Sequence, residues 1–257
     1  MRHLLCAVLF LLVGISTLAQ TSTRVSQWQA TSLAQKSIAA LTGKATLQDV
    51  TLNVDAISVL GSDYEMGSGL LRAQGFSLSR VDLNLGNGTR SEFRAITAQG
   101  PAGGWKTNGA ALRSYANHNC KTDAAWFFPA FTSLSQYGNR AYVFQYLGQK
   151  QHGGVNAEHI RIYQTTGIAL LEHLSTEDFY LDPTTLLPLA IAFQVHPDTD
   201  GSKDIPAEVR FANYHSVNGI QVPFHIQRLL NGGLILDVTV TSATFNSGLP
   251  SSTFSLR

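Results

Sequence analysis

The segment YHSVNGIQVPFHIQR, residues 214–228, carries the features on which the fold prediction rests. After the hairpin-type pair Asn218-Gly219, apolar residues occupy every second position, as in a strand with one buried face. Pro223 has no N–H for a strand ladder, so it marks an edge, a bulge or a bend. The two histidines raise the alternative of an active site, but His225 falls on the polar face. The segment therefore predicts a bent hairpin in a curved sheet, with an apolar face made of Ile220, Val222, Phe224 and Ile226.

The same period-two pattern extends over most of the chain and predicts about 10–11 strands joined by short turns. Strands linked by short turns pair antiparallel, so the fold class is mainly β. Residues 25–41 predict a helix, and the glycine-rich residues 98–116 predict a loop. Hairpin turns are expected near Gly86–Gly88, Asp182–Leu186, Asp198–Lys203 and Val217–Gly219.

The first 19 residues have a basic start, an apolar run and a small-residue exit, and they predict a cleaved signal peptide. The protein is therefore expected in the periplasm or secreted, as a single domain of residues 20–257 with no permanent membrane span after cleavage. Without Arg2 the chain has 17 basic and 17 acidic residues, which excludes a basic field for nucleic acid. Cys120 is the one cysteine after residue 19, so no internal disulfide is expected.

Three blocks in the C-terminal half resemble the periplasmic lipoprotein carriers and outer-membrane lipoprotein-sorting proteins (LolA/LolB-like). They are FYLDPTTLLPLAIAFQV (179–195), VRFANYHSVNGIQVPFHIQR (209–228) and TSATFNSGLPSSTFSL (241–256). The resemblance implies a strongly curved, incomplete antiparallel β-barrel, closed by a few helices around an apolar cavity for acyl chains. It also implies a non-enzymatic binding protein, whose partner is a lipid acyl chain or a lipidated protein. We expect it to act as a monomer.

An aromatic segment in the middle of the chain supplies the candidate lid and cavity residues. Three of its members follow the i, i+4, i+7 spacing of one helix face. The side chains could line a lipid cavity, or they could fill the barrel as ordinary core. The candidate lipid-binding residues are Trp126, Phe127, Phe128, Phe131 and Leu134.

No sequence motif supports catalysis, a metal or a cofactor, so none of these is predicted. The eight histidines have no compact metal-ligand spacing, and the acidic segment DTDGSKD (198–204) is interpreted as a polar hairpin loop, not a calcium site. A rival hypothesis is a metal-assisted hydrolase, which requires at least two histidines and a carboxylate to converge. A third is a sensor or interaction module that keeps the carrier-like shell without a transported ligand.

Overall fold

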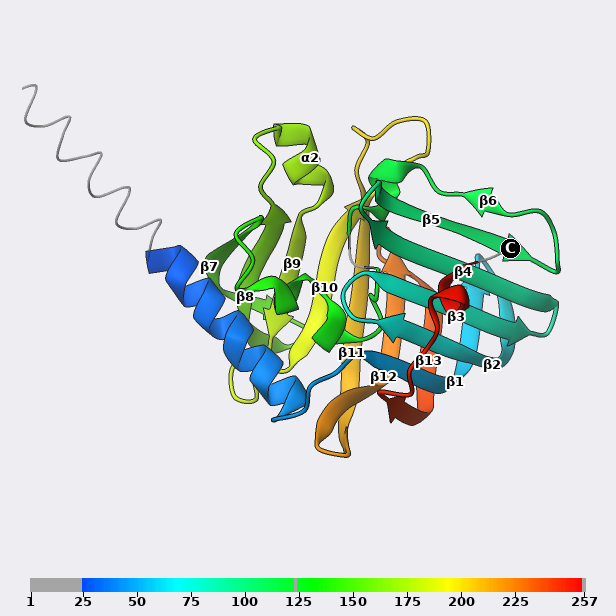
Figure 1. Ribbon diagram of the computed structural model, residues 1–257, viewed down its shortest axis with the longest axis horizontal. Helices are drawn as coiled ribbons and strands as arrows, with labels where there is room; N and C mark the ends of the chain where they lie inside the picture. Colours follow the sequence, from blue (N-terminus) through cyan, green and yellow to red (C-terminus); the bar gives the residue numbers. More distant parts are fainter. Residues whose placement is uncertain (1–24, 123, 256–257) are drawn as a thin grey trace, which may run out of the picture.

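The computed structural model describes residues 25–122 and 124–255 (Figure 1). The predicted signal peptide lies outside these residues. One 13-stranded sheet dominates the molecule, in the order β6-β5-β4-β3-β2-β1-β13-β12-β11-β10-β9-β8-β7, and every strand pair in it is antiparallel. The first half of the sheet is β1 (Asp49–Leu60), β2 (Asp63–Gln74), β3 (Leu78–Leu85), β4 (Gly88–Thr97), β5 (Gly100–Thr107) and β6 (Arg113–Ser114). The second is β7 (Tyr142–His152), β8 (Val155–Gln164), β9 (Glu177–Leu181), β10 (Pro188–Val195), β11 (Ile205–Val217), β12 (Ile220–Leu230) and β13 (Gly233–Phe245).

Two consecutive strand meanders meet in the middle of this sheet. Strands β1–β6 run outward in one direction and β13–β7 in the other, and the first and last long strands pair with each other. The outermost strands β6 and β7 do not pair, so the curved sheet stays open. The prediction of an incomplete antiparallel β-barrel is confirmed, with 13 strands where the sequence suggested about 10–11.

The glycine-rich residues 98–116 account for part of that difference, and the prediction of a loop there was wrong. They form β5 and the two-residue β6. The pairing places Gly103 and Gly104 opposite Arg94 and Phe93 of β4. A Cβ on Gly103 would lie 3.0 Å from the Phe93 carbonyl oxygen and 3.1 Å from the Tyr115 ring, so this strand needs glycine for close packing. A strand with glycine at three of its first five positions shows no apolar alternation.

Helical residues 25–42 confirm the predicted N-terminal helix, and they cover one half of the sheet (Figure 1). The Ser26 hydroxyl donates to the Tyr146 carbonyl in β7, and at the other end Gly43 approaches the carbonyl of Gly219 in the β11–β12 turn. The helix therefore spans the concave face of β7–β11. Its buried stripe has helical spacing and consists of Ala30, Ala34, Ser37 and Leu41.

The 214–228 segment forms the predicted bent hairpin. Asn218 and Gly219 both have positive φ, 52° and 82°, as a two-residue hairpin turn requires. Strand β12 pairs with β13 only from His225 onward, so Pro223 interrupts no bond on that side. The turns at Gly86-Asn87, Asp182–Leu187 and residues 196–204 lie where the sequence places them.

The other helical pieces are short: α2 (Ala169–Leu174) and the 3-10 turns η1 (Asn117–Cys120), η2 (Pro129–Phe131), η3 (Ser133–Gln136) and η4 (Ser251–Phe254). None of the helices formed by residues 25–122 and 124–255 has the length and apolar character that crossing a bilayer requires.

Candidate functional site

The five candidate lipid-binding residues lie in the segment that crosses the interior between the two halves of the sheet. As Pro129 suggests, a short helical piece starts there, but it consists of the two 3-10 turns η2 and η3. The rings of Phe128 and Phe131 pack edge to face, with centroids 5.1 Å apart. All five side chains are buried, from 0% exposed for Phe127, Phe128 and Leu134 to 5% for Phe131. Trp126 is the one of the five that also lines a groove open to solvent.

That groove has a volume of about 630 Å³ and lies on the concave face of β1, β3, β4 and β5, against the ends of β12 and β13. A volume of this size falls within the range of roughly 300–1,000 Å³ typical of small-molecule pockets. Apolar side chains make up most of its wall: Val59, Leu60, Val81, Leu83, Trp105, Trp126, Leu230, Ile235 and Leu236. The helix of residues 25–42 does not contribute to this wall.

Charged side chains also point into the groove, although they stand on the core-facing side of a strand. The pairing puts Arg90 opposite Leu83 and Glu92 opposite Val81, so both share the face of those buried residues. Arg90 donates to Glu65 at 2.6 Å and to the Ser58 hydroxyl at 2.7 Å. It is thus neutralised and held at the groove wall.

Glu92 is the centre of a second, partly buried charge cluster. Its carboxylate accepts a hydrogen bond from Arg94 at 2.8 Å and lies 3.5 Å from a terminal nitrogen of Arg228. Burial raises the pKa of Glu92, but Arg228 and Arg94 outweigh it and hold the pKa below its usual value. Arg228 also lies over the Trp126 ring, 4.9 Å from its centroid. One carboxylate thus serves two guanidinium groups, which leaves the cluster with net positive charge.

The groove continues past this cluster into a second hollow of about 360 Å³. The two share Trp105, Tyr115, Arg228, Leu230 and Ile235, while the far end is lined by polar residues that include Asn119 and His196. Burial and the Glu92 carboxylate raise the pKa of Tyr115 far above its usual range, so this phenol stays protonated. The site therefore runs from an apolar end through a basic centre to a polar end.

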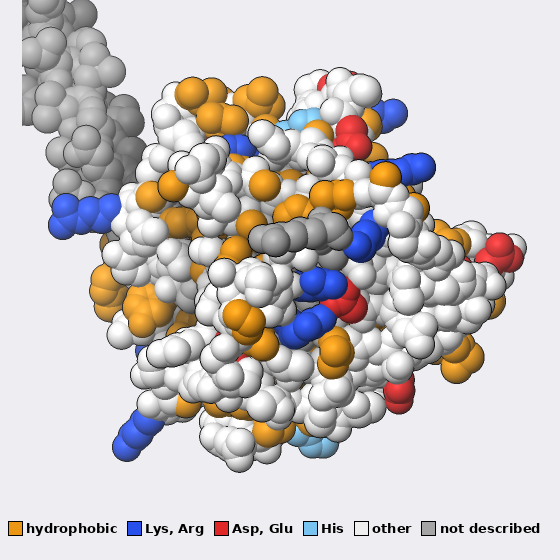
Figure 2. All heavy atoms as spheres, turned by 45° about the vertical axis from the view of Figure 1, so that its right-hand side comes forward, with side chains coloured by type: hydrophobic (Ala, Val, Ile, Leu, Met, Phe, Trp, Pro, Cys, Tyr) orange, Lys and Arg blue, Asp and Glu red, His pale blue; other side chains and the backbone are white. Residues whose placement is uncertain are grey.

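A further hollow of about 670 Å³ lies on the opposite, polar face of the sheet. Its lining includes Asn53, Asp55, Ser68, Asp82 and Asn84. Figure 2 shows one side of the surface, on which basic and acidic side chains lie together near the centre and hydrophobic ones form small separate groups. A surface of this kind offers no extended apolar contact, so the concave groove is the better candidate site.

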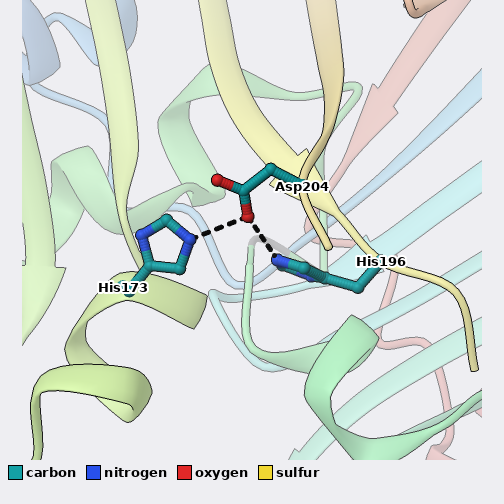
Figure 3. A group of neighbouring side chains, drawn as sticks. All are labelled: His173, His196 and Asp204. Carbon is teal, nitrogen blue, oxygen red and sulfur yellow. Dashed lines mark hydrogen bonds and ion pairs between the residues drawn. The ribbon is translucent and has the colours of Figure 1, made fainter. Parts of the chain in front are cut away.

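Except for His173 and His196, the described histidines do not combine with a second histidine around one carboxylate. His152 and His159 stack on the buried ring of Tyr180 and contact Glu208 and Asp178, respectively, and His225 contacts Asp237. Three other residues do converge: His173, His196 and Asp204, whose possible ligand atoms all lie within 4.8 Å of one another (Figure 3). No motif in the sequence marks this group, because His173 comes from α2 while His196 and Asp204 stand at the two ends of the β10–β11 loop. The arrangement is the one that the hydrolase hypothesis requires.

Solved structures of other proteins have a similar fold. No family model and no curated protein sequence matches the chain. Solved structures that resemble it include a DUF1329 family protein from Desulfovibrio piger, with a TM-score of 0.61 and 12% identity over 90% of this chain and 97% of that one. An outer-membrane lipoprotein-sorting protein domain from Vibrio parahaemolyticus has a TM-score of 0.59 and 11% identity over 89% and 97%. A LolA superfamily protein from Nitrosomonas europaea has a TM-score of 0.54 and 10% identity over 88% and 97%.

These similarities extend over nearly the whole of each structure, at low sequence identity. The chain therefore has the fold of the lipoprotein-sorting and LolA superfamily structures, as the three C-terminal sequence blocks implied. A fold shared at this identity does not carry a function with it.

Proposed function

We propose that this protein binds the acyl chain of a lipid or of a lipidated partner, in the periplasm or outside the cell, without catalysing a reaction. The observation that carries the proposal is the groove on the concave face, with apolar walls and an opening to solvent. The shared fold with lipoprotein-sorting structures and the predicted signal peptide at residues 1–19 support it.

Burial of methylene groups is sufficient to hold such a ligand. Each CH₂ moved from water into an apolar site contributes about 0.8 kcal/mol, so a twelve-carbon chain gains roughly 9 kcal/mol before ordering costs. Leu60, Leu83 and Leu236 provide aliphatic contacts along the groove, and Trp105 and Trp126 provide broad ring faces. Neither a covalent bond nor a metal is needed for this mode of binding.

The basic centre of the groove favours a ligand with an anionic head. Arg228 is the guanidinium least closely held by Glu92, at 3.5 Å against 2.8 Å for Arg94. A carboxylate or phosphate that reached Arg228 would form a charge-assisted hydrogen bond inside a partly desolvated groove. The apolar chain would then extend along Val81 and Leu83 toward Leu60.

The segment from Trp126 to Leu134 acts in this proposal as a lid. Trp126 lines the groove beside Arg228, while Phe127, Phe128, Phe131 and Leu134 anchor the segment in the core. A long acyl chain would displace Trp126 first and extend the groove toward the filled interior.

The test is lipid recovery followed by a binding assay. Native mass spectrometry and lipid extraction of the protein purified from its own cell envelope should yield a bound lipid. A fluorescent fatty acid should bind the purified protein, and Trp105→Ala should weaken it at least tenfold because that ring lines both hollows. Trp28→Ala is the matched control, since Trp28 is 72% exposed on the N-terminal helix.

Recovery of no lipid, together with no binding of the fluorescent fatty acid, would reject the proposal. Equal effects of the two tryptophan substitutions would reject the groove as the site. If either result is obtained, a sensor or interaction module becomes the favoured function. The filled interior around Phe127 and Phe128, and the exposed apolar residues Leu60, Tyr64 and Met66 on the β1–β2 hairpin, favour that candidate.

A further inference from the structure

Two imidazoles and one carboxylate meet near the polar end of the groove (Figure 3). A single oxygen of Asp204, Oδ1, lies 2.8 Å from Nε2 of His173 and 3.1 Å from Nε2 of His196. Both ring nitrogens therefore point at the same atom from different sides.

One residue comes from the short helix α2, and the other two stand at the ends of the β10–β11 loop. His173 lies in the last turn of α2, where its side chain is 45% exposed. His196 directly follows β10, and its side chain is only 1% exposed. Asp204 directly precedes β11, at the end of the β10–β11 loop.

The backbone around His196 is fixed independently of the cluster. The Asn119 amide oxygen accepts from the His196 N–H at 2.9 Å, and the Asn119 amide nitrogen donates to the His196 carbonyl at 2.7 Å. The His118 ring packs edge to face on the His196 ring, with centroids 5.9 Å apart. Since the least exposed of the three residues is also the most constrained, the cluster has one rigid ligand and two adjustable ones.

We propose that His173, His196 and Asp204 form a binding site for a divalent transition-metal ion of the Zn²⁺ type. Two neutral imidazoles and a carboxylate are ligands that Zn²⁺ commonly takes in proteins, and three protein ligands leave a fourth position for water. Ca²⁺ and Mg²⁺ prefer sites built from oxygen atoms, and this site offers two nitrogens.

The present spacing is close to that of a bound ion. Ligand atoms about 2.0–2.2 Å from one tetrahedral metal lie roughly 3.3–3.6 Å apart, so the two contacts to Asp204 must open by about half an ångström. His173 on the short helix α2 and Asp204 at the loop end can supply this movement while His196 stays in place. Asp198 and Asp200 in the same loop add negative charge that attracts cations.

The affinity should be moderate. A metal bound at Nε2 leaves the proton of His196 on Nδ1, and that atom is buried without a hydrogen-bond partner among the described residues. Metal-binding histidines usually donate this proton to an acceptor, and loss of the acceptor weakens binding 10- to 100-fold. With three protein ligands and no such acceptor, we expect a dissociation constant on the order of micromolar for Zn²⁺.

Isothermal titration calorimetry tests the site. The purified protein, without a histidine tag, is freed of metal with a chelator and titrated with ZnCl₂. We expect one Zn²⁺ per chain, and a loss of affinity of at least tenfold in His173→Ala and in Asp204→Asn. Both residues are more than two-fifths exposed in their side chains, so neither substitution should unfold the chain, and circular dichroism checks this.

His225→Ala is the matched control. His225 also contacts a carboxylate, Asp237, at 3.0 Å, but with a single imidazole. Its removal should leave the affinity for Zn²⁺ unchanged, and Zn²⁺ should raise the melting temperature of this variant as it does in the unaltered protein. Absence of saturable binding at one ion per chain would overturn the proposal, as would equal losses in all three variants. The cluster would then be a hydrogen-bonded tie between α2 and the β10–β11 loop.

Discussion

The two halves of the sheet differ in what covers their concave faces. In the filled half, β7–β11, the helix of residues 25–42 covers the concave face, and the aromatic segment around Phe127 packs in the core between the two halves. In the open half, β1–β5 with the adjoining ends of β12 and β13, the same face borders a groove. The strands of both halves pair antiparallel throughout, so we attribute the difference to the covering elements and not to the strand pairing.

The halves differ in the charges on their inner faces. In the filled half, His159, Arg161 and Asp178 form ion pairs on the outer face, behind apolar inner residues such as Ile160 and Phe179. Glu177, which accepts from Ser133, is an inward-facing carboxylate there. In the open half Arg90, Glu92 and Arg94 stand on the inner face. Charges are costly in a dry core and tolerable beside water, so the inner charges mark the half that stays accessible.

This contrast suggests that the core and the groove have different roles, one in stability and the other in binding. The shared core, which includes buried residues of both halves, supplies free energy of folding through buried apolar area. The groove of the open half keeps charged groups available to a ligand. Substitutions in the core and in the groove should then have different consequences, which the following experiments measure.

The largest effect is expected from Phe127→Ala in the shared core. Phe127 is fully buried, and removal of a buried phenylalanine ring leaves a cavity that costs about 3–5 kcal/mol of unfolding free energy. Trp105→Ala in the open half, where water can enter the vacated space, should cost about 1–2 kcal/mol. Urea unfolding followed by circular dichroism measures both. Equal losses would show that the groove is as closely packed as the core.

The next effect tests the inner charges of the open half. Glu92→Gln leaves Arg94 and Arg228 without their shared carboxylate, and we expect a loss of about 2–3 kcal/mol, somewhat below the usual range for a broken buried pair because the groove admits water. Glu158→Gln is the control: this carboxylate accepts from Tyr146 and Gln149 on a partly exposed surface, and its loss should cost less than about 1 kcal/mol. If Glu92→Gln left the free energy of unfolding unchanged, the charge cluster would be fully hydrated in the folded protein.

The sequence predicted the parts of the fold that local chemistry determines. Asn218-Gly219 and Pro223 predicted a bent hairpin, because a positive φ and a missing N–H each restrict the backbone at one position. The N-terminal helix was predicted by its apolar stripe. Strand β5 was missed because Gly103 and Gly104 are selected for close backbone approach, which leaves no periodic pattern.

The site was less predictable, since it depends on contacts between distant residues. Trp126 was recognised from its aromatic neighbours, but its contact with Arg228 joins positions 102 residues apart in the chain. Glu92 and Arg94 appear in the sequence as an ordinary polar face, and only the pairing with β3 shows that they face inward. His173, His196 and Asp204 have no common motif because a short helix and the two ends of a loop bring them together.

A pH titration addresses the outer charges of the filled half. Burial raises the pKa of Asp178, but hydrogen bonds from His159 and Arg161 outweigh it and lower the pKa to about 2. Since the folded value lies below the ordinary value, the carboxylate stabilises the fold above about pH 4, and this contribution is lost as the pH falls toward 2. It should amount to about 2 kcal/mol.

Asp178→Asn should therefore lower the unfolding free energy at pH 7 and flatten its decrease between pH 4 and pH 2. The exposed Asp55 on β1 gives the control variant Asp55→Asn, whose acid profile should follow that of the unaltered protein. An unchanged acid profile in Asp178→Asn would show that the outer ion pairs do not contribute to stability.

The smallest effect on stability is expected at the groove wall, where Glu65 neutralises Arg90. Glu65→Gln should cost about 1 kcal/mol, because the Arg90 side chain that loses its partner is 30% exposed and keeps its hydrogen bond to the Ser58 hydroxyl. It also removes one negative charge beside the groove, so an anionic fluorescent fatty acid should bind roughly two- to threefold more tightly at low salt, as expected for a unit charge about 8 Å away in water. The gain should shrink as salt is added, because the Debye length falls to about 3 Å at 1 M. A substitution that weakens the fold slightly while it strengthens binding would place Arg90 in the ligand site, whereas weaker binding in Glu65→Gln would mean that the pair itself shapes the groove.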